Sequence, residues 1–227
     1  MIFRGEMSGA ALREACATGN IFVVSKIIAG ASDVSGMRSK IESGLSIGMV
    51  RIHRQSLKDV VNERDSKTLN APVHLACLSG AKDCLELLLA TGECNATASG
   101  SKGQSAAAFC AYLGRYDCMR LLLEQSSAIN VNETAGENQW NLLQMAAAGG
   151  HYACVALLLE YGASINTVNC DGNTALHLAN MANHIDVGRL LRDAGADCKI
   201  RNLAMMSAID VCASSESRAL FSASPIR

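Results

Sequence analysis

The hexapeptide TALHLA at residues 174–179 decides the fold, because related hexapeptides return along the chain at nearly constant intervals. The most similar copy is APVHLA at residues 71–76, and weaker copies are SAAAFC, NLLQMA and SAIDVC, which begin at Ser105, Asn141 and Ser207. The five starts, at 71, 105, 141, 174 and 207, are 34, 36, 33 and 33 residues apart. A fainter copy begins at Ala10. A period of this size is typical of a repeat architecture.

Each repeat contains two predicted helices. Nine residues after each start stands a residue suited to a left-handed helix C-cap; these are Gly19, Gly80, Gly114, Gly150 and Asn183. An apolar trio follows at offsets i, i+3 and i+4, which place it on one helix face; it is Cys84, Leu87 and Leu88, then residues 118, 121 and 122, then 154, 157 and 158, then 187, 190 and 191. A second turn comes 21 residues after the start. The unit is therefore a helix, a tight turn, a second helix and a loop.

This pattern resembles the ankyrin repeat, a β-turn followed by two antiparallel helices in a unit of 33 residues. The resemblance covers about 190 of the 227 residues. It implies an all-α solenoid of stacked helix-turn-helix units joined by short hairpin loops.

The repeats predict how the chain is organised. Residues 1–34 form an N-terminal capping repeat, in which Glu14 and Lys26 replace core leucines. Residues 35–65 carry neither the hexapeptide nor a Leu-Leu pair, so they are an irregular helical insertion, which we favour, or a degenerate repeat. Four repeats and a truncated C-terminal capping repeat with a tail follow, at residues 66–99, 100–135, 136–168, 169–201 and 202–227.

Composition limits the partners. Of all residues, 49% are hydrophobic and 18% are charged, and the net charge is −1. No electrostatic field favours a polyanion, so we expect no nucleic acid partner. No apolar run approaches the length of a membrane span, so we expect no membrane partner. The N-terminal residues lack the apolar core of a signal peptide. We therefore expect a reduced, cytoplasmic protein, with the nucleus as the other intracellular possibility.

The sequence predicts no catalytic, metal or cofactor site. Cys84, Cys118 and Cys154 share a slot that accepts valine in the next repeat, which indicates core thiols without disulfides. His74 and His177 belong to the hexapeptides, and the resemblance implies local hydrogen bonding for them. The G-x-S-x-G pattern at residues 44–48 lacks the preceding strand that a hydrolase elbow requires. We expect no enzyme activity, no cofactor and no small-molecule substrate.

Candidate partner-binding residues occupy positions that the repeat does not need for its own core. In ankyrin-like stacks these are the exposed end of the inner helix and the loop tips. Where a solvated face would carry Lys or Glu, this chain has large apolar side chains, which are frequent in interface cores. The candidates are Leu78, Tyr112, Leu113, Trp140 and Met181. The alternative is that these side chains pack against neighbouring loops or against the segment at residues 35–65.

The resemblance implies a non-catalytic protein–protein interaction module that binds a protein partner on its concave face, as an adaptor, scaffold or regulatory subunit. Two alternatives stay open. One is an enzyme or sensor whose active part lies in residues 35–65. The other is a self-associating structural protein that uses the same apolar face.

Overall fold

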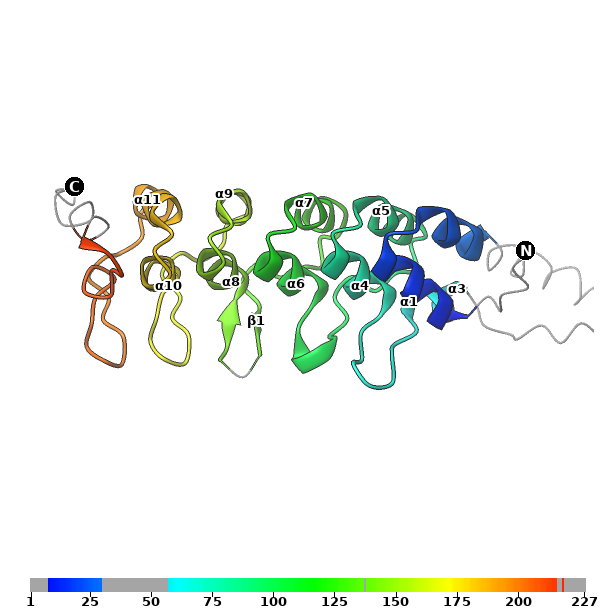
Figure 1. Ribbon diagram of the computed structural model, residues 1–227, viewed down its shortest axis with the longest axis horizontal. Coiled ribbons are helices and arrows are strands. Elements are labelled where there is room, and N and C mark those ends of the chain that lie inside the picture. Colours follow the sequence, from blue (N-terminus) through cyan, green and yellow to red (C-terminus); the bar gives the residue numbers. More distant parts are fainter. Residues whose placement is uncertain (1–7, 30–56, 137, 216–217, 219–227) are drawn as a thin grey trace, which may run out of the picture. The chain divides into compact units, whose positions relative to one another are not determined.

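A computed structural model describes residues 8–29, 57–136, 138–215 and 218 (Figure 1). The chain divides into two compact units, Met1–Ser101 and Lys102–Arg227. Both units are built from pairs of antiparallel helices followed by hairpin loops, as the repeat pattern predicts. The all-α expectation is confirmed, since the strands in the described residues are two of two residues each.

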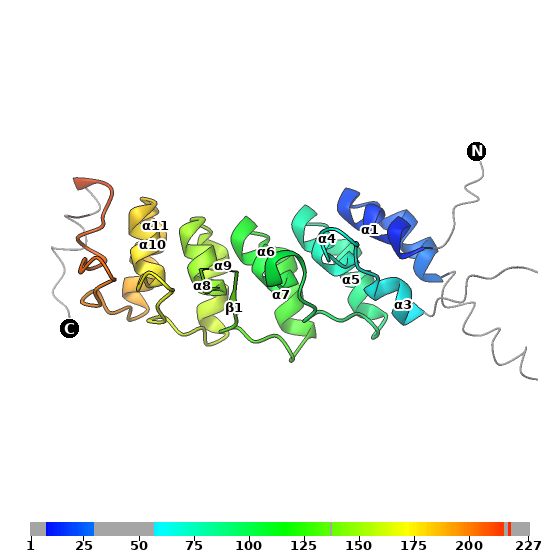
Figure 2. The ribbon, with the colours of Figure 1, turned by 90° about the horizontal axis from the view of Figure 1, so that it is seen from below.

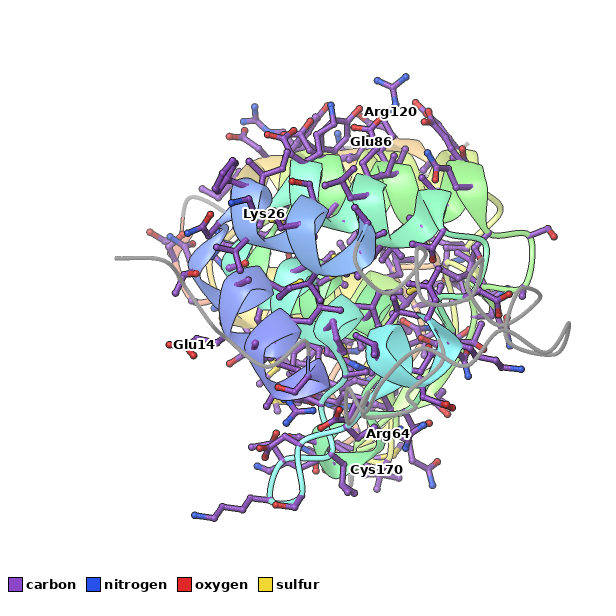
Figure 3. The ribbon with its side chains drawn as sticks, turned by 90° about the vertical axis from the view of Figure 1, so that its right-hand side faces the viewer. Glu14, Lys26, Arg64, Glu86, Arg120 and Cys170 are labelled. Carbon is purple, nitrogen blue, oxygen red and sulfur yellow. The ribbon has the colours of Figure 1, made fainter. Side chains whose placement is uncertain are left out.

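The first unit contains α1 (Gly9–Thr18), a second helix at residues 21–29, α3 (Leu57–Asn62), α4 (Pro72–Ser79) and α5 (Lys82–Ala90). Helix α1 packs against α3 and α4, and α4 packs against α5. The core of this unit includes Leu12, Cys16, Leu85 and Leu88, whose exposure is 0%. Glu14 and Lys26 are exposed, as expected for a capping repeat, and both are labelled in Figure 3.

The second unit begins in the short 3-10 helix η1 (Ser101–Gly103). Its inner row of helices is α6 (Ala106–Leu113), α8 (Leu142–Ala148) and α10 (Ala175–Met181). Its outer row is α7 (Tyr116–Gln125), α9 (Tyr152–Glu160) and α11 (Ile185–Asp193). Figures 1 and 2 show each outer helix beside the inner helix of its own repeat. The strands β1 (Thr134–Ala135) and β2 (Trp140–Asn141) pair antiparallel in one hairpin loop.

The cap and turn residues act as their types suggest. The side chains of Ser105, Asn141 and Thr174 accept hydrogen bonds from backbone N–H groups three residues further on. Each predicted turn residue has a positive φ. The φ angles are 68°, 74°, 67° and 72° at Gly19, Gly80, Gly114 and Gly150, and 59° at Asn183.

Buried polar side chains join α4, α8 and α10 to the loops that follow them. Nδ1 of His177 accepts from the Thr174 N–H at 3.3 Å and from its hydroxyl at 2.8 Å, and Nε2 lies 3.2 Å from the Met206 carbonyl oxygen. Nε2 of His74 lies 2.8 Å from the Ala98 carbonyl oxygen. Gln144 fills the same position in its repeat and donates to the Thr167 and Asn173 carbonyls at 2.9 and 3.1 Å. The expected local hydrogen bonding of these histidines is confirmed.

The hairpin loops reverse direction at a fixed place in the repeat. Two residues before each hexapeptide start stands a residue with positive φ; these are Leu69, Gly103, Gln139, Gly172 and Met205. Asparagine side chains connect successive loops, because Oδ1 of Asn132 accepts from the Ser164 N–H at 2.7 Å and Oδ1 of Asn166 accepts from the Asp197 N–H at 2.9 Å.

The segment at residues 35–65 falls mostly outside the described residues. Residues 30–56, including the G-x-S-x-G pattern at 44–48, are not among them. In α3, Val60 and Val61 are buried. Oδ1 of Asn62 accepts from the Asn95 N–H at 2.7 Å, the same type of bond as at Asn132 and Asn166. Residues 57–65 therefore connect to the hairpin loops in the same way as the last residues of the later repeats. Whether the remainder is an insertion or a degenerate repeat stays a prediction.

The cysteine slots lie in the core as predicted. Cys84, Cys118 and Cys154 are each 1% exposed, and Cys110 and Cys212 are also buried. All ten cysteines are within the described residues and are present as thiols. Cys170 is exposed and is labelled in Figure 3.

Candidate protein-interaction face

The two helix rows of the second unit differ in charge. The inner row has the sequences AAAFCAYL, LLQMAAA and ALHLANM in α6, α8 and α10, without one charged residue. Among these six helices, all of the charged residues lie in the outer row; they are Asp117, Arg120, Glu124, Glu160, Asp186, Arg189, Arg192 and Asp193. The side chain of Arg120, labelled in Figure 3, projects away from the helices. Charge is therefore confined to one of the two rows.

The surface of the inner row lies at the C-terminal ends of its helices. Tyr112 at the end of α6 is 59% exposed, and Met181 at the end of α10 is 50% exposed. Between them, at the end of α8, Ala148 is half-buried and Gly149 is exposed. Ala182, just after Met181, is also exposed. Because α8 packs against both α6 and α10, these five residues lie at the ends of neighbouring helices, and we call them the apolar row.

Two histidines hold the backbone of the apolar row in place. Nε2 of His151 donates to the Tyr112 carbonyl oxygen at 3.0 Å, and Nε2 of His184 donates to the Ala148 carbonyl oxygen at 3.1 Å. Each bond joins the start of an outer helix to the inner helix of the preceding repeat. A Cβ added at Gly114 or Gly150 would collide with the ring of His151 or His184, respectively. These glycines are needed both for the left-handed turn and for the approach of the ring.

The structure brings together only some of the predicted binding residues. Tyr112 and Met181 are exposed on the apolar row, and Leu113 is half-buried beside Tyr112. Leu78 is half-buried at the end of α4, in the first unit. Trp140 is half-buried in β2, and its indole Nε1 is buried without a hydrogen-bond partner in the described part of the chain. Truncation of Trp140 would therefore disturb packing as well as any binding.

The expectation that Trp140 and its equivalents stand at loop tips is wrong. Asn70 and Asn173 occupy the same slot as Trp140 and are only 5% and 6% exposed. The chain reverses direction at the preceding residue, where φ is positive. The residue before each hexapeptide therefore lies past the tip, on the returning side of the hairpin loop. There Asn173 donates from its N–H to Oδ1 of Asn169 at 2.8 Å.

Sequence reasoning missed the last hairpin loop. Leu203, Met205 and Met206 are 76%, 69% and 40% exposed. The Leu203 N–H donates to the Asp171 carbonyl at 3.0 Å, which joins this hairpin to the preceding one. The signal was visible as LAMM at residues 203–206, where the preceding loop has NCDGN at residues 169–173. The hexapeptide that follows, SAIDVC, is a weak copy and gives this loop little support as part of a repeat.

Burial shifts the pKa of several cysteine and histidine side chains. Burial raises the pKa of the Cys94 thiol to about 12 and that of Cys154 to about 11. Burial also lowers the pKa of His74 and His177. In residues 8–29, 57–136, 138–215 and 218 there is no group of three or more His, Cys, Asp or Glu side chains placed to hold a metal ion. Over the same residues, no helix has the length and apolar character to cross a membrane.

The comparison with protein families agrees with the repeat geometry. A family model described as "Ankyrin repeats (3 copies)" matches residues 45–135 and 125–202, well over half of the chain. The protein therefore belongs to the ankyrin-repeat family. Proteins of this family are generally protein–protein interaction modules and are typically non-enzymatic. A search of curated proteins found no match.

Proposed function

We propose that this protein is a cytoplasmic, non-catalytic adaptor, scaffold or regulatory subunit that binds a protein partner through the apolar row of its second unit. Tyr112 and Met181 are the main contacts, and Leu113 and Trp140 support them. Leu78 occupies the equivalent slot in the first unit.

The observation that carries this proposal is the exposure of large apolar side chains on a row whose own core is already complete. Leu122 and Leu158 are 0% exposed and fill the space between the helix rows, whereas Tyr112 and Met181 are at least half exposed. Exposed aromatic residues and methionines contribute little to folding, but they are frequent among the residues that dominate interface energies. The hydrogen bonds of His151 and His184 hold the backbone at Tyr112 and Ala148, and a backbone that is already ordered loses less entropy on binding.

The test is an affinity capture with three baits. The wild type, the double variant Tyr112→Ala/Met181→Ala and the control Arg189→Ala are immobilised and exposed to a lysate of cells that make this protein. Arg189 is an exposed residue of the outer row. We expect a set of proteins that the wild type and the control retain and the double variant loses at least tenfold. If all three baits retain the same proteins, the apolar row is not the binding site.

A second candidate function is self-association through the same row, which the same exposed side chains favour. Sedimentation velocity over a range of concentrations distinguishes the two functions. An adaptor with a different partner has a constant mass as the concentration rises. A self-associating protein gains mass, and Tyr112→Ala/Met181→Ala abolishes that gain.

A further inference from the structure

We propose that the second unit opens locally where the hairpin loop of β1 and β2 meets the hairpin loop at residues 169–173, and that this opening presents the single tryptophan of the chain (Figure 1). We call the contact between these two loops the Trp140 joint. The inference does not depend on the apolar row, because it concerns the hairpin loops and not the ends of the inner helices.

The contact between the next two hairpin loops, at residues 169–173 and 202–206, gives a reference for this joint, and we call it the later joint. In the Trp140 joint, the Cys170 N–H donates to the Asn138 carbonyl oxygen at 3.4 Å. In the later joint, the Leu203 N–H donates to the Asp171 carbonyl oxygen at 3.0 Å. Both donor and acceptor are 33 residues further along the chain. The two joints therefore have the same backbone arrangement and can be compared residue by residue.

The residue before the hexapeptide has a side chain that bridges to the following loop in two of the repeats. Oδ1 of Asn70 accepts from the Ser101 N–H at 2.9 Å. Oδ1 of Asn173 accepts from Nδ2 of Asn202 at 2.9 Å, and Asn173 and Asn202 are both buried. An acceptor at this position thus joins one hairpin loop to the next.

Trp140 occupies this position in the Trp140 joint and cannot make the bond, because its indole has an N–H donor but no acceptor. Asn169 stands where Asn202 stands in the later joint. Oδ1 of Asn169 already accepts from the Asp171 and Asn173 N–H groups, at 3.0 and 2.8 Å. Nδ2 of Asn169 and the indole Nε1 of Trp140 are both buried, and neither has a hydrogen-bond partner in the described residues. The joint therefore contains two buried donors and lacks the acceptor that would serve them.

The two donors favour opening of the joint. A buried donor without an acceptor has lost its hydrogen bond to water and has gained none in return. When the joint opens, water reaches both donors, so the open state regains bonds that the closed state lacks. Protein segments held by few interactions open in this way without unfolding of the whole molecule. Opening also exposes the indole ring, a side chain that is frequent among the residues that dominate interface energies.

Native-state hydrogen exchange followed by NMR measures this opening directly. Because the chain has one tryptophan, it gives one indole N–H signal. We expect that signal and the Cys170 amide to exchange at least tenfold faster than the amide of Leu158, which lies in α9 and is 0% exposed. Their exchange should change little with low, non-denaturing urea, since a local opening exposes little surface. If both protons exchange at the rate of the Leu158 amide, the joint opens only with the whole molecule, and the proposal is wrong.

Two substitutions at one position test whether the missing acceptor is the cause. Trp140→Asn supplies an acceptor like that of Asn173, whereas the matched control Trp140→Phe removes the indole and supplies none. We expect the Cys170 amide to exchange at least fivefold more slowly in Trp140→Asn than in Trp140→Phe. The Ser164 amide, which donates to Oδ1 of Asn132 between the same two repeats, should be unaffected.

The reverse change in the later joint gives an independent measurement. Asn173→Leu has nearly the same size and no acceptor, so it leaves Nδ2 of Asn202 without its partner. We expect the Leu203 amide to exchange at least fivefold faster in this variant than in the wild type. If Trp140→Asn and Trp140→Phe exchange alike at Cys170, and Asn173→Leu leaves Leu203 unchanged, the missing acceptor does not control the opening and the inference is wrong.

Discussion

At the scale of single residues, one position shows how chemically different side chains perform the same structural task. His74, His177 and Gln144 follow their hexapeptide starts by three residues, and each accepts from the backbone N–H of its start residue and reaches a carbonyl of the following loop. The histidine ring, unlike the amide of glutamine, can take up a proton. When Nδ1 accepts a hydrogen bond, protonation of that atom breaks it.

This difference predicts a pH dependence of stability. Burial lowers the pKa of His74 and His177, although hydrogen bonds to the Ala98 and Met206 carbonyls act in the opposite direction. The unfolded chain therefore binds more protons below the ordinary histidine pKa of about 6.5. The contribution to the free energy of unfolding is complete above that pH and is lost as the pH falls through the lowered pKa values. Urea unfolding at a series of pH values measures it.

The control is the double variant His74→Gln/His177→Gln, which copies Gln144. We expect it to fold at neutral pH and to lose less stability than the wild type between neutral and mildly acidic pH. An identical pH profile for both proteins would show that other groups cause the dependence.

The thiols provide a second prediction at this scale. Cys170 is exposed, whereas burial raises the pKa of Cys94 and Cys154 and keeps their reactive thiolate forms rare at neutral pH. We expect a small alkylating reagent to label Cys170 first in the native protein, and Cys170→Ser to remove this fast phase. Under denaturing, non-reducing conditions all ten cysteines should react. A reproducible shortfall of two labels would reveal a disulfide and contradict the prediction.

At the scale of elements, the turns between inner and outer helices could be predicted from the sequence and the hairpins could not. A glycine or asparagine nine residues after each start was sufficient, because few residues adopt a left-handed C-cap easily. The hairpin reversal falls on Leu69, Gln139 and Met205, residue types that do not mark a positive φ. Backbone pairing across the hairpin accompanies each reversal instead: Ala135 pairs with Trp140, the Asp65 N–H donates to the Asn70 carbonyl, and the Asn202 N–H donates to the Met206 carbonyl. The sequence therefore does not indicate that Trp140 lies half-buried in β2, after the reversal.

A pair of glycine substitutions tests the turn between the helix rows. Gly114→Ala and Gly162→Ala both place a Cβ on a residue with positive φ, at 67° and 80°. At Gly162 the new atom has no neighbour within 4 Å, whereas at Gly114 it collides with the His151 ring. We expect Gly114→Ala to lower the free energy of unfolding by about 1–2 kcal/mol more than Gly162→Ala.

The same comparison in a His151→Ala background identifies the cause. If the ring causes the additional loss, the two glycine substitutions become similar once the ring is absent. A difference that persists without the ring would mean that the backbone at Gly114, and not its contact with His151, determines the cost.

At the scale of the whole molecule, the sequence was informative about folding and less so about binding. The repeat spacing, the cap residues and the cysteine slots led to the correct family and core, because the same core requirements return in every unit. The exposure of Tyr112 and Met181 also agrees with the sequence. The apolar row needed the structure, since the packing of α8 against α6 and α10 determines which helix ends are neighbours. The apolar hairpin at Leu203–Met206 lies before a weak hexapeptide, SAIDVC, which does not mark it as part of a repeat.

The central claim is that the apolar row binds a partner and contributes little to folding. The measurement that tests it most directly pairs thermal melts with affinity titrations, using the partner recovered with the wild-type bait, for Tyr112→Ala, Met181→Ala and the buried Leu158→Ala. We expect the two row variants to weaken binding at least tenfold and to leave the melting temperature within about 2 °C of the wild type. Leu158→Ala should lose about 2–5 kcal/mol of stability, because it leaves a cavity in the core. If Tyr112→Ala and Met181→Ala melt like Leu158→Ala, or keep full affinity, the claim is contradicted.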